Sequence, residues 1–313
     1  MIIEVSPRVL KIQQMRSFVA VYQEHSFTSA AKRLRATQSG LSMQIKELED
    51  HLGVELLTRT SAGVHPTPAG ERFYQRAVSI LHDLSDAEED MRKMQGQLSG
   101  SAVVGLMPTF SRAVLPPVLK DFKDEHPLVD VQVFEAYSGV LTKAVIAGEA
   151  DFAIVPPDGT IEGISMKHVA TDREVLVTRS DTNLGHLDPI CLKDIDPIKL
   201  ILPRSGNSRR TRLDAYLNRI GAKVDSIIEI DGMMGTLDMI AQSDWMAILP
   251  GALCVPDLDG ALRKLHPLVD PVLTVDYVLI QSDVRVLNPA ADAIAETFVR
   301  QVQKICGEVE QRF

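Results

Sequence analysis

The chain has 313 residues with 45% hydrophobic and 24% charged content, which is typical of a globular protein long enough for two or three domains. No apolar run approaches the roughly 18 residues of a membrane span, and the N-terminus lacks a secretory pattern, so we expect a cytoplasmic protein without a membrane partner. Three separated cysteines suit a reducing compartment and argue against a disulfide framework or a CxxC metal site.

The net charge of −9 is unevenly distributed along the chain. Residues 1–80 hold ten Lys and Arg against seven Asp and Glu, residues 81–98 hold two against five, and residues 99–313 hold 21 against 30. A mildly basic N-terminal module joined to an acidic body is compatible with nucleic-acid binding by that module, which the global charge alone would hide.

Residues 10–52 are predicted to form three helices. The first is amphipathic, residues 27–34 form a short second helix, and the third covers residues 38–52, with Thr37 as its N-cap and Gly53 as the residue that ends it. The buried face of the third helix is predicted to hold Leu41, Ile45, Leu48 and Leu52.

Such a tri-helical unit with a polar, exposed third helix is typical of a helix-turn-helix DNA reader. After Gly53, a Ser-Ala-Gly turn between two short extended arms predicts a wing. Each polar residue alone is better explained as solvated helix surface, but the turn and the buried stripe together favour DNA binding. The candidate DNA contacts are Thr28, Ser29, Arg33, Arg35, Gln38, Ser39, Ser42, Met43, Lys46 and Arg59.

The clearest periodic signal lies in residues 69–98, where apolar residues recur at alternating spacings of four and three. This heptad seam predicts a helix of roughly 40 Å that pairs with a second copy of the chain. A long helix packed on its own domain is the alternative. The seam consists of Phe73, Ala77, Ile80, Leu84, Ala87, Met91, Met94 and Leu98.

From residue 101 onward, strands and helices alternate in two series, which predicts two α/β lobes with parallel sheets. The first series is strand 101–107, helix 111–125, strand 129–136, helix 139–148 and strand 151–155. The second series is strands near 164–179, strand 199–203, helix 207–220, strand 226–230, helix 233–242 and strand 246–250. Strand 274–282 and a helix from about 288 are left over. The simplest topology returns them to the first lobe, with a cleft between the lobes.

The run FVAVYQEHSFTSAAKRLRATQSGLSMQIKELEDHLGVELLTRTSAGVHPTPAGERF resembles the winged helix-turn-helix of LysR-type transcriptional regulators. LPPVLKDFKDEHP and GEADFAIV extend the resemblance over nearly the whole chain. The resemblance implies an α+β multidomain fold with three parts. These are a winged helix-turn-helix DNA-binding domain (10–67), a dimerising linker helix (68–98) and a two-lobed α/β periplasmic-binding-protein-like effector domain (99–313). Lobe I would cover about 99–162 and 269–313, and lobe II about 163–268.

The resemblance also implies partners. We expect double-stranded DNA carrying an interrupted inverted repeat, bound by a homodimer that assembles into a homotetramer. The assembly is expected to change shape when a small inducer binds between the lobes, and RNA polymerase is a further candidate partner. Family members usually carry Arg or another polar residue after the Leu-Ser pair, whereas this chain has LSMQ. Met43 is therefore expected to pack against thymine methyl groups rather than contact phosphate or guanine.

Several polar residues lie just after a predicted strand, at the start of a helix, where unpaired backbone N–H groups can bind an anion. Helix capping explains any one of them equally well, but their gathering around one cleft favours a small organic anion as effector. Arg204 and Arg209 could pair with a carboxylate, yet the adjacent Arg210 and Arg212 favour an exposed basic face. The family resemblance adds the turn formed by Asp231 and Gly232 in the second lobe. The candidate effector-binding residues are then Thr109, Ser111, Ser138, Gly139, Arg204, Ser205, Asn207, Asp231 and Gly232.

The sequence shows no GxSxG, HExxH or GxxxxGK[ST] signature. We therefore predict a regulator rather than an enzyme, with no catalytic residues, metal or cofactor. One alternative is a cytoplasmic solute-binding protein, which would leave residues 10–98 unexplained. The other is a redox sensor that uses Cys191 and Cys254, although neither lies in a basic setting.

Overall fold

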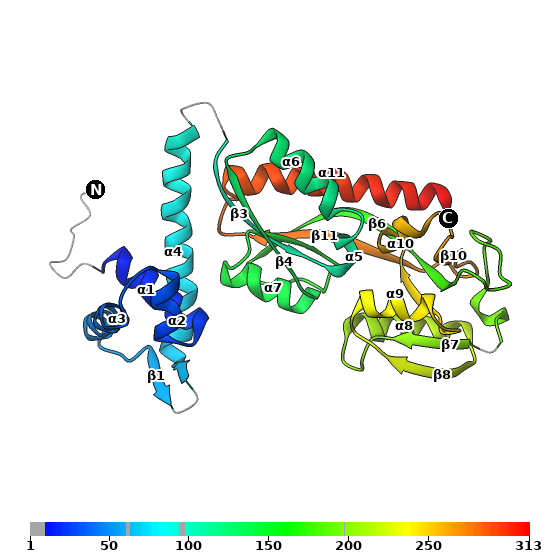
Figure 1. Ribbon diagram of the computed structural model, residues 1–313, viewed down its shortest axis with the longest axis horizontal. Coiled ribbons are helices and arrows are strands. Elements are labelled where there is room, and N and C mark those ends of the chain that lie inside the picture. The colour runs from blue at the N-terminus through cyan, green and yellow to red at the C-terminus, as the bar shows by residue number, and fades with distance from the viewer. Residues whose placement is uncertain (1–9, 61–62, 94–97, 197) are drawn as a thin grey trace. The chain divides into compact units, whose positions relative to one another are not determined.

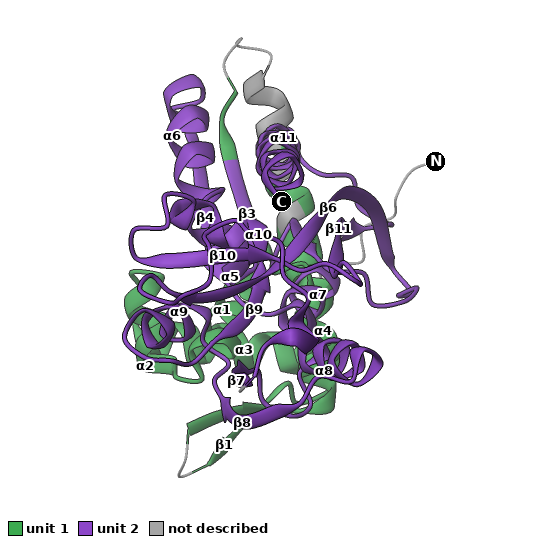
Figure 2. Ribbon diagram, turned by 90° about the vertical axis from the view of Figure 1, so that its right-hand side faces the viewer, with its two compact units in different colours: residues 1–100, 147–149 green, residues 101–146, 150–313 purple. Residues whose placement is uncertain are grey.

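The computed structural model describes residues 10–60, 63–93, 98–196 and 198–313. The chain divides into two compact units, coloured separately in Figure 2. Unit 1 is Met1–Gly100 with Ala147–Glu149, and unit 2 is Ser101–Ile146 with Ala150–Phe313. No helix among the described residues combines the length and the apolar character that a membrane crossing requires.

Unit 1 contains the predicted helices and wing. Its elements are α1 (Ile12–Glu24), α2 (Phe27–Arg33), α3 (Gln38–Leu52), β1 (Leu57–Thr60), β2 (Gly63–Pro66) and α4 (Pro68–Lys93). Thr37 caps α3 by accepting a hydrogen bond from the Gly40 N–H at 3.1 Å, and Gly53 ends the helix with a φ of 70°, as predicted. Leu41, Ile45 and Leu48 are buried in the core of the unit.

The prediction for Leu52 was wrong, because its side chain is 37% exposed. The helix ends at this residue, one turn beyond the last buried position, Leu48, so no neighbouring element covers it. The stripe of apolar residues therefore continues in the sequence for one turn longer than the packing does.

Helix α4 carries the heptad seam, and its two parts differ in burial. Phe73 and Ala77 pack within unit 1, with Ala77 fully buried. Further along, Ile80 is 44% exposed, Leu84 is half-buried and Ala87 is exposed. The start of the seam thus follows the alternative interpretation of a helix packed on its own domain, and the later positions leave an apolar face uncovered. Met94 lies outside the described residues, and Leu98 lies beyond the end of the helix.

Unit 2 contains two groups of strands and helices, which we call lobe I and lobe II. Lobe I begins with β3 (Gly100–Leu106), α5 (Pro108–Ser111), α6 (Leu115–Glu125), β4 (Val129–Glu135), α7 (Ser138–Ala147) and β5 (Phe152–Val155), and ends with β11 (Thr274–Ser282) and α11 (Pro289–Arg312). Lobe II contains η1 (Leu192–Asp194), β7 (Ile198–Leu202), α8 (Ser208–Ile220), β8 (Val224–Glu229), α9 (Met233–Ala241), β9 (Ala247–Pro250), α10 (Gly251–Cys254), η2 (Val255–Asp257) and β10 (Arg263–Pro267). The predicted helix 111–125 begins later, at Leu115, because Pro116 and Pro117 favour the first turn of a helix there, and the separate short helix α5 precedes it.

One long strand, β6 (Ile164–Arg179), is shared by both lobes. Its first part pairs with β11, and its last part pairs with β9 and β10, all antiparallel. The sheet runs in the order β10-β6-β11-β5-β3-β4, with β9 also paired to β6. Parallel pairing holds for β3 with β5 and for β7 with β8, whereas the strands that connect the lobes are antiparallel.

The final strand and helix return to lobe I, as the topology argument predicted. β11 pairs with β5 on one side and with β6 on the other. Helices α6 and α11 cover one face of the lobe I sheet and α7 covers the opposite face (Figure 1). This arrangement leaves the carboxyl ends of β3, β4 and β5 directed toward lobe II, where the cleft forms.

Candidate DNA-binding surface and ligand cleft

The exposed face of α3 presents the residues that the sequence assigned to it. Met43 is 60% exposed, which confirms that it lies outside the buried stripe. Gln38, Ser39 and Lys46 are also exposed, and Ser42 is half-buried beside them. In the preceding helix, Thr28 and Ser29 are exposed as well, and Ser26 caps that helix through the Ser29 N–H at 3.3 Å.

Two of the candidate arginines near the turn differ in their surroundings. Arg33 donates to Gln23 Oε1 at 2.8 Å and forms an ion pair with Glu24 at 3.3 Å. Both charged side chains are well exposed, so the pair is weak and a phosphate group could replace Glu24. Arg35 is exposed at the end of the turn, with a positive φ of 51°.

The wing is an antiparallel pair of β1 and β2, in which Leu57 lies opposite Pro66 and Thr60 opposite Gly63. Residues 61–62 of the predicted turn lie outside the described residues. The wing is anchored to α3 by Glu49, whose Oε1 accepts hydrogen bonds from Leu56 N at 2.7 Å and Leu57 N at 3.1 Å. Arg59 on β1 reaches back to α3, where its Nη2 donates to Ser42 Oγ at 2.7 Å.

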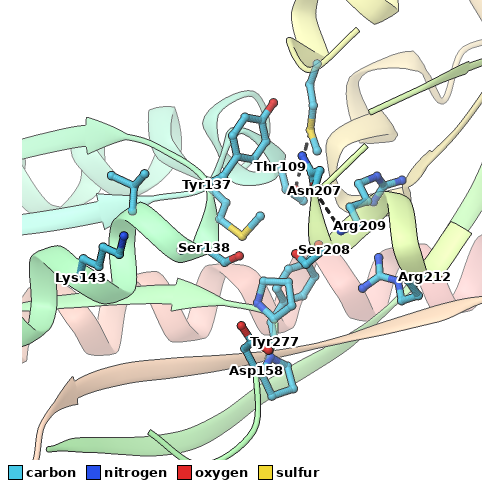
Figure 3. A pocket seen from close by; sticks show the side chains of 17 residues that line it. Thr109, Tyr137, Ser138, Lys143, Asp158, Asn207, Ser208, Arg209, Arg212 and Tyr277 are labelled. Carbon is cyan, nitrogen blue, oxygen red and sulfur yellow. Dashed lines mark hydrogen bonds between the residues drawn. The ribbon is translucent and has the colours of Figure 1, made fainter. Parts of the chain in front are cut away.

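Unit 2 holds a cavity of about 580 Å³ between lobe I and lobe II (Figure 3). Lobe I contributes the turn after β3, the first turns of α7 and the segment after β5. Lobe II contributes the first turns of α8 and the start of α9. The apolar part of the wall includes Met107, Val140, Pro156, Pro157 and Met233.

The predicted effector residues divide into two groups. Four of them line the cavity: Thr109, Ser138, Gly139 and Asn207. Asn207 also caps α8 by accepting from Arg209 N at 2.9 Å. The structure does not bring the other five to this wall: Ser111, Arg204, Ser205, Asp231 and Gly232.

Local partners explain where several of those five lie. Ser111 donates to Glu135. Arg204 is held by Asp231, with its Nε 2.5 Å from Oδ2 and its backbone N 3.0 Å from Oδ1. This pairing lowers the pKa of the Asp231 carboxyl, chiefly through the hydrogen bond from the Arg204 backbone N–H. Asp231 lines a smaller adjoining cavity, and Gly232 is the N-cap residue of α9.

The cavity wall also contains a buried charge cluster that the sequence reasoning missed. The carboxylate of Glu174 on β6 is fully buried. Arg209 donates to its Oε2 at 2.7 Å and to its Oε1 at 3.2 Å, and Arg212 Nη2 also donates to Oε1. Two guanidinium groups therefore share one carboxylate, which leaves one net positive charge at the wall. In the described part of the chain, Arg212 Nε is buried and has no hydrogen-bond partner.

The expectation of an exposed basic face on α8 was wrong. The side chains of Arg209 and Arg210 are 13% and 15% exposed. Arg210 pairs with Asp214 at 2.9 Å and with Glu229 at 2.8 Å. Each of these arginines is thus held by an acidic partner. Two of those partners, Glu174 and Glu229, lie on strands outside the helix, where local sequence patterns do not reveal them.

Other polar groups at the cavity differ in charge. Lys143 is exposed and forms no ion pair with any residue that the structure describes, and Asp158 is exposed on the segment after β5 (Figure 3). Tyr137 lies between the lobes and donates from its hydroxyl to the Asp231 carbonyl. Burial, followed by the nearby Asp231 charge, raises the pKa of Tyr137, and burial raises that of Tyr277 as well. Both phenols therefore remain neutral and add no negative charge to the wall.

The cysteines give no support to the redox alternative. Cys254 is fully buried, and burial raises the pKa of its thiol well above the ordinary range. A thiol in this state is mostly protonated and is a poor nucleophile. Cys191 is half-buried and donates weakly to the Asp270 carbonyl at 3.5 Å. Within the described ranges, no group of three His, Cys, Asp or Glu side chains could hold a metal ion.

Comparison with known families matches both parts of the chain. The model described as "LysR substrate binding domain" matches residues 95–303. The model described as "Bacterial regulatory helix-turn-helix protein, lysR family" matches residues 12–71.

Among similar proteins, a probable hydrogen peroxide-inducible genes activator from Streptomyces viridosporus is 30% identical over 240 residues, which cover 76% of this chain and 77% of that protein. A full-length OxyR variant from Pseudomonas aeruginosa has a similar fold, with a TM-score of 0.74 at 20% identity over 96% of this chain and 97% of that one. Full-length CbnR in complex with its target DNA gives a TM-score of 0.65 at 20% identity, over 93% of this chain and 100% of that one. At these identities, the two structures inform the fold alone.

Proposed function

Because the chain belongs to the LysR family of transcriptional regulators, which join a DNA-binding helix-turn-helix to an effector-binding domain, we propose that the cleft in unit 2 binds a small organic anion that controls transcription. The chain is a LysR-type DNA-binding transcriptional regulator, and its family is made up of regulators rather than enzymes.

The observation that carries the proposal is the excess positive charge at the cavity wall. Arg209 and Arg212 together bear two positive charges against the single charge of Glu174. Arg212 lines the cavity with a side chain that is 32% exposed. A carboxylate placed beside its exposed part would compensate the excess charge, because a carboxylate is a planar acceptor that matches a guanidinium group.

The rest of the wall suits the remainder of such a ligand. Thr109 and Ser138 offer hydroxyl groups on the lobe I side, and Ser138 stands in the first turn of α7, where backbone N–H groups favour an anion. Met107, Val140 and Met233 provide an apolar surface for a carbon skeleton. Asp158 is exposed and therefore screened by solvent, so it opposes an anion only weakly.

Calorimetry on the full-length protein, with a panel of carboxylates and their neutral amides, tests the proposal. Arg212→Gln should weaken carboxylate binding by about 1.5–3 kcal/mol, the range for a hydrogen bond to a charged group, and Ser138→Ala by about 1 kcal/mol. Arg210→Gln is the matched control, because Arg210 lies on the same helix but does not line the cavity. Tighter binding of the neutral compounds would contradict the anion proposal.

The assembly of the regulator is a further part of the proposal. We retain the domain division 10–67, 68–98 and 99–313, with dimers formed through the exposed apolar face of α4 at Ile80, Leu84 and Ala87. Two such dimers would form a homotetramer in the cytoplasm that binds an interrupted inverted repeat and acts on RNA polymerase. Analytical ultracentrifugation and footprinting on a selected operator would test the stoichiometry and the spacing of the half-sites.

A further inference from the structure

Arg59, Phe27 and Ser42 form a contact between the wing and α3. The guanidinium carbon of Arg59 lies 4.2 Å from the centre of the Phe27 ring, and Nη2 donates to Ser42 Oγ at 2.7 Å. Phe27 is itself buried in the core of unit 1. The arginine is therefore supported by a rigid ring on one side and bound to α3 at its tip, which fixes its guanidinium plane relative to the helix.

This contact determines how the Ser42 hydroxyl can be used. A serine hydroxyl has one proton to donate and two lone pairs that accept, whereas an arginine only donates. Ser42 Oγ must therefore act as the acceptor toward Arg59, and its own proton has to point elsewhere. Serine and threonine in helices often donate to the carbonyl four residues earlier, as Thr297 in α11 does to Ala293 O at 3.0 Å. Ser42 makes no such hydrogen bond to any of the described residues.

The position of Ser42 brings this unused proton to the surface proposed to meet DNA. Ser39, Ser42 and Lys46 share one side of α3, and Met43 is exposed next to them. We propose that Arg59 is a positioning residue for DNA recognition, which acts by fixing the Ser42 hydroxyl as a hydrogen-bond donor directed into the major groove. Nε and Nη1 of Arg59 have no partner among the residues described, so they stay available for a phosphate group at the same time.

A fixed donor selects among bases. Guanine presents N7 and O6 as acceptors in the major groove, adenine presents N7 and thymine presents O4, whereas cytosine presents an amino donor. A freely rotating hydroxyl would accept from cytosine as readily as it donates to the others. Arg59 occupies one of the two Ser42 lone pairs, and its positive charge polarises the hydroxyl into a better donor and a poorer acceptor, so Ser42 should disfavour cytosine at one position of each half-site.

Site selection from a random duplex library, with the full-length protein, tests this inference. Ser42→Ala should relax the discrimination against cytosine about fivefold at one position, which corresponds to about 1 kcal/mol at 1.4 kcal/mol per tenfold. Arg59→Leu should relax discrimination at the same position, and the double variant should add nothing there because the two residues act as one unit. Ser42→Thr retains the hydroxyl, so this variant should discriminate against cytosine as the original protein does.

Arg35→Leu is the matched control, since Arg35 is a candidate DNA contact that is exposed in the turn, where we expect it to meet a phosphate group. This variant should weaken DNA binding evenly across sequences. It should also reduce the slope of the logarithm of the binding constant against the logarithm of the salt concentration by the contribution of about one phosphate contact. If Arg59→Leu behaves like this control, with base preferences unchanged, the inference is overturned. Ser42→Ala leaves Arg59 and its packing on Phe27 in place, so an unchanged cytosine penalty in that variant overturns it even where Arg59→Leu unfolds.

Discussion

Replacing Glu174 by Gln should destabilise unit 2 strongly. The side chain is fully buried and accepts three hydrogen bonds from Arg209 and Arg212, whose side chains are 13% and 32% exposed. The substitution keeps the shape but leaves both guanidinium groups without their counter-charge. Breaking a buried ion pair costs about 3–5 kcal/mol, and because Gln retains one acceptor oxygen we expect the lower end, about 3 kcal/mol.

This loss of stability can be measured in the intact chain. Trp245 is the single tryptophan and packs against the lobe II core, so its fluorescence reports the unfolding of unit 2. For a unit of this size, 1 kcal/mol corresponds to about 2–4 °C, so Glu174→Gln should lower the melting temperature by about 6–12 °C. Arg204→Gln, which removes an exposed arginine from lobe II, should leave it nearly unchanged.

Glu174→Gln should strengthen anion binding, although it lowers the stability of unit 2. Removing the negative charge beneath the wall increases its net positive charge, so carboxylates should bind more tightly to the folded variant although it unfolds more easily. A variant with the melting temperature of the original protein would show that the carboxylate is not buried against the two arginines. That result would refute the proposed excess of positive charge at the cavity wall.

Three further predictions concern other parts of the chain. Met43→Ala should barely change the melting temperature but relax the preference at one base pair per half-site by about 1 kcal/mol; a large thermal shift with unchanged preference would place Met43 in the core. The double variant Ile80→Lys, Leu84→Lys should be monomeric in analytical ultracentrifugation, and persistent dimers would place the interface elsewhere. Burial raises the pKa of Asp172 from 3.8 to about 7, so the folded state binds its proton more tightly and loses stability as the pH rises from about 4 to about 7. Asp172→Asn should flatten that dependence in denaturant titrations, and an unchanged slope would refute it.

Much of the fold could be predicted because its signals are local. The caps at Thr37 and Gly53 and the bounds of α3 depend on neighbouring residues, and the structure agrees with them. Strand pairing depends on distant segments, so the sequence could indicate strands near 164–179 but not that they form one strand paired antiparallel with β11. The start of α6 at Leu115 depends on Pro116 and Pro117 in its first turn, which are a local signal for a helix start at that point.

The candidate cleft shows the same division. Thr109, Ser138 and Asn207 were found because the pattern of a strand followed by a polar helix start is local. The Glu174–Arg209 contact joins residues 35 positions apart, which spacing alone cannot reveal. One signal did point to it: Glu174 begins the otherwise apolar run EVLV, and a carboxylate on a buried strand requires a cationic partner.

The continuous strand β6 limits how this regulator can be divided. Residues 164–173 pair with β11 in the sheet of lobe I, and residues 174–179 pair with β9 and β10 in lobe II. Removing either lobe would leave the other with an unpaired strand edge, which tends to associate with other chains. Recombination between relatives could therefore exchange the effector domain as a whole, but not one lobe at a time. New ligand specificity has to arise by substitutions at the cavity wall while both lobes are inherited together.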